Sequence, residues 1–134
     1  MPQAIDTDCM NLKLIYNFTY RLTGNIRIAE TLIRETVSSS PETLDNEQAL
    51  LKLVWRRFLF CYGNVSFTAK EELQQFLLEL APEIRAVLIL RDILGLSVSQ
   101  ISAITGSPED EILPLLAAGR RNLSRKKKPA RITA

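Results

Sequence analysis

Apolar residues recur at intervals of three and four along most of the chain, and turn-forming residues separate these stretches. This spacing places the apolar side chains on one face of a helix. No segment shows the persuasive alternation of apolar and polar residues that is typical of a β-strand. We therefore predict an all-α fold. In its first 94 residues, we expect helices over 11–23, 26–37, 46–62, 70–80 and 82–94.

The stretch from Ser97 to Arg121 predicts two further helices joined by a tight turn. Ser97 and Gln100 have the spacing of a capping box, in which each side chain bonds the backbone of the other residue. Gly106 can adopt the positive φ that ends a helix, and Ser107 then opens the second helix ahead of a proline. This pattern indicates a helix-turn-helix and a nucleic-acid partner. An ordinary helical hairpin in an all-α core would have the same pattern.

The charges are segregated along the chain. All 15 acidic residues lie at or before Glu111, so that residues 1–119 sum to −5 and residues 120–134 to +7. Such a basic end can follow a phosphate backbone, although a solvated terminus would look the same. The candidate DNA-binding residues are Ser97, Gln100, Ser107, Arg120, Arg121, Arg125, Lys126, Lys127 and Lys128.

The composition argues against several classes of protein. With 134 residues, the chain can bury one core or two small ones, and no apolar run approaches the roughly 20 residues of a membrane span. No secretion signal is visible, so we expect a cytoplasmic protein. Histidine is absent, and Cys9 and Cys61 lack metal-ligand spacing, which favours buried reduced thiols. We expect no enzyme activity, cofactor, metal or small-molecule substrate.

Two segments together resemble bacterial extracytoplasmic-function sigma factors, which belong to the sigma-70 family. LIYNFTYRLTGNIRIAETLIRETV, from Leu14 to Val37, resembles their region 2, and the segment from Glu79 to Ile112 resembles their region 4. The latter includes a Leu-x-Pro-x-x-Arg start and an Arg-Asp-x-x-Gly-Leu-Ser entry to the helix-turn-helix.

The resemblance implies two small helical domains, 1–66 and 67–134, and the short linker between them, about residues 64–69, predicts that they are packed together. It implies core RNA polymerase and promoter DNA as partners. The residues that it places on a polymerase-binding helix are Glu30, Ile33, Arg34 and Glu35.

The second helix of the helix-turn-helix departs from the family pattern. Its middle, residues 113–118, reads LPLLAA and offers no polar side chain to a base edge, while three acidic residues occupy its first turn. We expect Pro114 to kink or end this helix early. We also expect Leu113 and Leu115 to form an exposed face that binds a protein partner.

These features leave three functions open. The first is a sigma-like regulator of transcription initiation that acts through protein contacts more than base reading. The second is a sigma mimic that binds an anti-sigma factor without reading DNA, because residues 47–58 are similar to the sigma-like domain of general-stress response regulators. The third is a small repressor that binds a palindromic site as a dimer.

Overall fold

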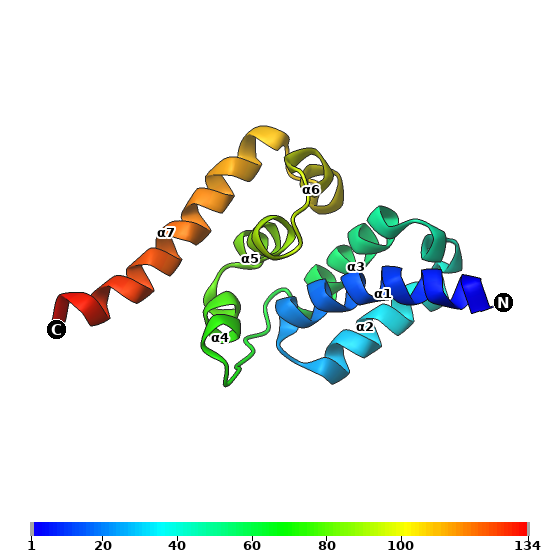
Figure 1. Cartoon of the computed structure of the whole chain (residues 1–134), viewed down its shortest axis with the longest axis horizontal. Coiled ribbons are helices and arrows are strands. Elements are labelled where there is room, and N and C mark those ends of the chain that lie inside the picture. The colour runs from blue at the N-terminus through cyan, green and yellow to red at the C-terminus, as the bar shows by residue number, and fades with distance from the viewer. Residues whose placement is uncertain (1, 134) are drawn as a thin grey trace.

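The computed structural model describes the backbone of residues 2–133 and the side chains of residues 12–125. Within these ranges the regular structure is helical, which confirms the all-α prediction (Figure 1). The elements are α1 (Pro2–Thr23), α2 (Ile26–Ser39), the 3₁₀ helix η1 (Pro41–Asp45), α3 (Glu47–Tyr62), α4 (Glu72–Glu79), α5 (Pro82–Leu88), the π-helical segment η2 (Ile89–Ile93), α6 (Val98–Thr105) and α7 (Glu109–Thr133). No helix in the described residues combines the length and hydrophobicity needed to cross a bilayer.

Asparagine caps fix the starts of two helices in the first half. The side chain of Asn25 accepts a hydrogen bond from the backbone N–H of Ile28 at 3.1 Å, and Asn46 accepts one from Ala49 at 3.0 Å. Each bond satisfies a backbone donor that the first turn of a helix leaves unpaired. The predicted starts of α2 and α3 therefore agree with the structure to within one residue.

A single apolar core joins the two halves of the chain. Phe18 and Trp55 from the first half share it with Leu90, Ile101 and Leu116 from the second. Helix α3 packs against α6, and α1 contacts α4 and α5. Both predicted domains thus bury their apolar side chains in the same core, and residues 63–71 form the non-helical connection between α3 and α4.

The guanidinium of Arg85 ties the two halves together inside this core. Its side chain is 4% exposed, and its carbon atom Cζ lies 5.9 Å from the centre of the Phe58 ring. Burial lowers the pKa of Arg85, although a nearby carboxylate, Glu83, acts in the opposite direction. The guanidinium donates hydrogen bonds of 2.7–3.2 Å to the backbone carbonyls of Leu22, Leu77, Leu78 and Leu80.

Helix α7 lies at the opposite side of the molecule from α1–α3, and its C-terminal part extends away from the other helices (Figure 1). The first half of α7 packs on α5 and α6 through Ile112 and Leu116, both at most 2% exposed. The outer face of α7 therefore remains open to solvent along much of its described length.

Candidate nucleic-acid interface

The capping box predicted at the start of α6 is present. The Ser97 hydroxyl accepts a hydrogen bond from the Gln100 backbone N–H at 3.1 Å, and the Gln100 side-chain oxygen accepts one from the Ser97 N–H at 2.9 Å. Both residues are exposed. Because these oxygens already accept hydrogen bonds from the backbone, the two candidate DNA-binding side chains also stabilise the N-terminus of α6.

The turn between α6 and α7 also has the predicted form. Gly106 adopts a φ of +82° and ends α6, as its position in the sequence predicts. The Ser102 hydroxyl donates a hydrogen bond to the backbone carbonyl of Ser107 at 2.6 Å, and the Ser107 N–H bonds the Thr105 hydroxyl at 3.3 Å. Ser107 is therefore held firmly at the entry to α7, where it is partly exposed.

Helix α7 continues past Pro114, so the prediction of an early end is wrong. The helix runs unbroken from Glu109 to Thr133. A proline at this position removes the hydrogen bond to the Asp110 carbonyl, four residues earlier. Both Pro114 and Asp110 are exposed, so water can reach the freed carbonyl. The packing of Ile112 and Leu116 on the core supports the helix on its other side.

The predicted protein-binding pair of leucines does not form one face. Leu113 is 61% exposed, whereas Leu115 is half-buried and packs against the core. Residues two positions apart on an α-helix point about 200° away from one another, so they face opposite sides. Among the described side chains of α7, Leu113 is therefore the one large apolar side chain that is exposed.

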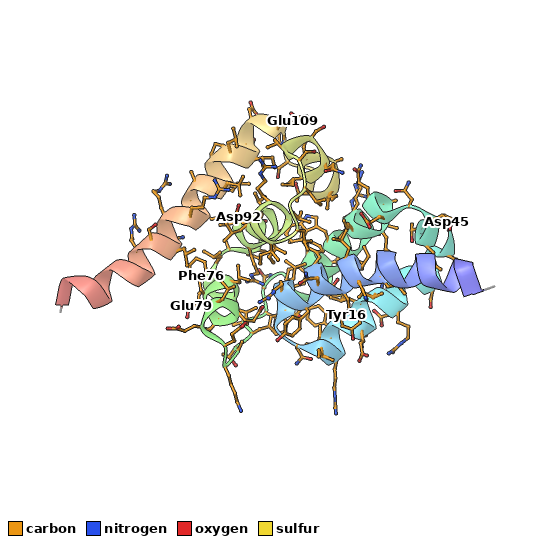
Figure 2. The ribbon with its side chains drawn as sticks, viewed as in Figure 1. Tyr16, Asp45, Phe76, Glu79, Asp92 and Glu109 are labelled. Carbon is orange, nitrogen blue, oxygen red and sulfur yellow. The ribbon has the colours of Figure 1, made fainter. Side chains whose placement is uncertain are left out.

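Arg120 makes an ion pair that sequence reasoning missed. Its Nε donates a hydrogen bond of 3.0 Å to one carboxylate oxygen of Asp92, and its Nη2 bonds the other (Figure 2 labels Asp92). This pairing is the main reason that the pKa of Asp92 lies below its ordinary value, with the charge of Arg91 adding to it, and it raises the pKa of Arg120. The Arg120 guanidinium is thus held against η2.

The other described cations of the basic end are more available to bind a phosphate than Arg120 is. Arg121 and Arg125 are exposed, and together with Ala117, Arg120 and Ser124 they line a shallow hollow of about 440 Å³ on α7. The side chains of Lys126, Lys127 and Lys128 lie outside the described residues. Among the described residues, no group of acidic or cysteine side chains is placed to hold a metal ion.

Three of the four predicted polymerase-binding residues lie on the surface of α2. Glu30, Arg34 and Glu35 are exposed, whereas Ile33 is only 7% exposed and belongs to the core, so its side chain is not open to a partner. Burial and a hydrogen bond with Glu30 raise the pKa of Tyr16 on α1. The carboxylate oxygen Oε1 of Glu35 lies 3.7 Å from Nη1 of Arg57 on α3. Helix α2 therefore makes polar contacts with both α1 and α3.

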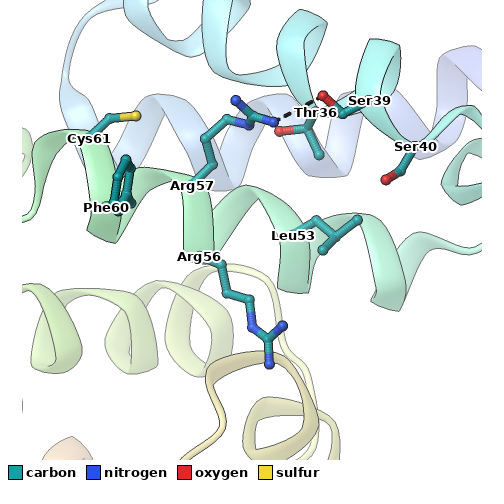
Figure 3. A pocket seen from close by; sticks show the side chains of 8 residues that line it. All are labelled: Thr36, Ser39, Ser40, Leu53, Arg56, Arg57, Phe60 and Cys61. Carbon is teal, nitrogen blue, oxygen red and sulfur yellow. Dashed lines mark hydrogen bonds between the residues drawn. The ribbon is translucent and has the colours of Figure 1, made fainter.

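A groove of about 390 Å³ separates the end of α2 from α3, as Figure 3 shows. Arg57 reaches across it and donates a hydrogen bond to the Ser39 hydroxyl at 3.1 Å, while Arg56 points to the other side of α3. Phe60 is 92% exposed at the groove. Cys61 is also exposed, so the prediction of a buried thiol is wrong for this residue; the side chain of Cys9 lies outside the described residues.

The comparison with known families supports the helix-turn-helix directly. Residues 70–121, which include α4 to α6 and the first half of α7, match the family model of sigma-70, region 4. No curated protein sequence matches the chain. The matched segment contains the capping box, Gly106 and the Asp92–Arg120 ion pair described above. Residues 70–121 therefore match a region 4 domain of the sigma-70 family of sigma factors.

Proposed function

We propose that this protein is a sigma-factor-like regulator of transcription initiation that binds core RNA polymerase and promoter DNA. The observation that carries the proposal is the region 4 match over residues 70–121, together with a capped helix-turn-helix in the same segment. This role would place the protein in the bacterial cytoplasm. Its contacts would be made with protein and phosphate more than with base edges, because residues 113–118 offer no polar side chain.

The basic end of α7 supports contact with the phosphate backbone. Arg121 and Arg125 are exposed on the helix, and three lysines follow them directly in the sequence. Cations that neutralise phosphates release condensed counterions, so the affinity falls steeply as salt is added. The acidic first turn lies at the other end of the helix and would repel phosphate. DNA contact therefore belongs to the second half of α7.

The surface of α2 supports contact with the polymerase. Glu30, Arg34 and Glu35 are exposed in the segment that resembles region 2, and Glu35 is fixed by its ion pair with Arg57. Charged side chains held in place by neighbouring helices lose little conformational freedom when they bind a partner. We propose these three side chains as the polymerase-binding set.

Run-off transcription tests the proposal as a whole. Purified protein is added to sigma-free core polymerase on fragmented genomic DNA, and the transcripts are sequenced. We expect discrete new start sites that share upstream elements. A set of transcripts identical to that of core polymerase alone, with no protein bound to the polymerase, would contradict the proposal.

A salt titration tests the phosphate contacts separately. Replacing Lys126, Lys127 and Lys128 with alanine should weaken DNA binding and reduce the slope of log affinity against log salt by about 3. The matched control replaces Lys13, Lys52 and Lys70, which lie outside α7, and changes the net charge equally. An equal loss in both triple variants would show that only net charge matters.

The mimic remains a second candidate because one observation favours it. Leu113 is 61% exposed on the helix that should enter the groove, directly after an acidic turn. An anti-sigma factor could occupy this apolar surface in place of DNA. In that case Leu113→Asp abolishes anti-sigma binding while helix content stays unchanged, and the run-off assay shows no new start sites.

A further inference from the structure

The outer face of α7 carries a stripe of five residues ordered by charge. It begins with an acid, continues with three apolar residues and ends with a base: Asp110, Leu113, Pro114, Ala117 and Arg121. These positions are three or four residues apart, so they lie on one side of the helix over about 16 Å. All are exposed except Ala117, which is partly exposed.

The charges at the two ends of this stripe have no partner within the described residues. The ion pairs there involve Arg21, Arg57 and Arg120, and neither Asp110 nor Arg121 takes part in one. Arg120, next to Arg121, is instead held by Asp92. The structure therefore leaves one anion and one cation free at opposite ends of an exposed apolar patch.

We propose that this stripe binds the same stripe on a second copy of the chain, with the two α7 helices antiparallel. The two-fold axis passes between positions 115 and 116. In this register, Asp110 of each copy faces Arg121 of the other, and Pro114 faces Ala117. The small side chain of Ala117 allows the helices to approach closely, and Leu113 covers the contact from the side.

Self-complementarity favours a second copy over other occupants. Asp110 and Arg121 are equally distant from the centre of the stripe, so one two-fold axis forms both ion pairs at once. A parallel arrangement would place Asp110 against Asp110 and Arg121 against Arg121, which is repulsive. A DNA backbone would meet the acidic end of the stripe unfavourably. The three-turn contact is small, and contacts below about 1,200 Å² are weak and transient.

The pairing would hide part of the helix that a region 4 domain presents to DNA. This consequence rests on the proposed function, whereas the pairing itself does not. If the protein dimerises but produces no new start sites with core polymerase, only the inference of pairing is supported. Promoter binding by a protein that stays monomeric would support only the proposed function.

Sedimentation equilibrium of the full chain, from about 10 µM to about 1 mM, tests the pairing, because dissociation constants in this range correspond to weak contacts. We expect a monomer–dimer equilibrium. Asp110→Arg and Arg121→Asp should each weaken it about tenfold, since each replaces two attractions per dimer with repulsions. A mixture of the two variants, and the double variant, should recover the original affinity. A monomer across the whole range would overturn the inference.

A second pair of variants tests the apolar part of the stripe. Leu113→Asp should abolish dimerisation. The matched control is Ile26→Asp on α2, where the replaced side chain is 56% exposed and lies away from α7. Circular dichroism checks that both variants remain folded. Dimerisation that survives Leu113→Asp, or that the charge-exchanged mixture does not recover, would exclude this face.

Discussion

Arg85 shows at the scale of single residues how the chain stabilises a buried charge without a carboxylate. Its four acceptors are carbonyls in or just beyond the last turns of α1 and α4. These carbonyls lie at the negative ends of their helix dipoles, where the last turn of a helix leaves acceptors unpaired; that of Leu77 also accepts a bond from the Leu80 N–H at 3.1 Å. One guanidinium therefore satisfies the ends of two helices that belong to different halves of the chain.

Replacing Arg85 with methionine should lower the free energy of unfolding by about 3 kcal/mol or more, because buried carbonyls lose their donors. Urea denaturation measures the change. Arg91→Met serves as the control: Arg91 is exposed and donates a single hydrogen bond to the Leu96 carbonyl, so we expect a loss under about 1 kcal/mol. Equal losses in the two variants would show that the carbonyl contacts do not stabilise the fold.

The Asp92–Arg120 pair should make stability depend weakly on pH. The pKa of Asp92 is lowered in the folded state, so the pair contributes fully above the ordinary value of about 3.9 and is lost as the pH falls through the folded pKa. The effect is small because the pair is exposed to solvent. We expect unfolding free energies at pH about 7 and about 2 to differ more in the wild type than in Asp92→Asn. An unchanged difference would contradict this role.

Among the elements, α6 and the turn after it depend most on local sequence. The capping box fixes the start of α6, and the positive φ of Gly106 ends it, so that α7 begins only three residues later. A residue with a side chain pays a steric cost in this left-handed conformation. The angle between α6 and α7 therefore depends on one glycine.

Gly106→Ala should lower the free energy of unfolding by about 1–2 kcal/mol, because an L-residue is strained at this φ. Crowding does not contribute, since no atom lies within 4 Å of the added Cβ position. Gly106→Asn should cost less, because asparagine tolerates the left-handed conformation. Thermal denaturation of both variants measures the difference. An alanine variant as stable as the wild type would show that the turn relaxes without cost.

Local signals were sufficient for the helix ends and insufficient for contacts between distant residues. Turn residues and apolar spacing predict α2 and α3, and the capping box predicts α6; the bonds at these helix starts lie within four residues. The sequence predicted one helix over 82–94, but its end is π-helical, with the Leu94 N–H bonded to the Ile89 carbonyl. Asp92 was missed as a site residue because its partner lies 28 positions away.

At the scale of the whole molecule, packing on the core determines which of the predicted surface side chains are exposed. The resemblance names Ile33 as a polymerase-binding residue, and the sequence predicts an exposed face of Leu113 and Leu115, yet Ile33 and Leu115 both contact the core. Phe60 shows the reverse: it is exposed although Phe58, two residues earlier on α3, is fully buried. Helical spacing gives the relative direction of side chains, but only the packing of α1, α3 and α6 determines which direction is inward.

A shared core predicts that the two halves unfold together. Trp55, the only tryptophan, is 2% exposed in α3 and reports on the first half. Leu116→Ala on α7 should lower stability by about 2–4 kcal/mol and shift the Trp55 fluorescence transition by the same amount as the loss of helix measured by circular dichroism. A fluorescence transition that stays in place would show that the halves unfold independently.

Because α7 is one continuous helix about 37 Å long, its acidic first turn and its basic second half stay at opposite ends of the helix. The charged side chains of α7 therefore contribute an electric moment directed along the helix, although the net charge of the protein is only +2. Near a polyanion such a molecule experiences a torque before it makes contact. Its basic end should turn toward the polyanion first, so that the orientation of the encounter is chosen during diffusion.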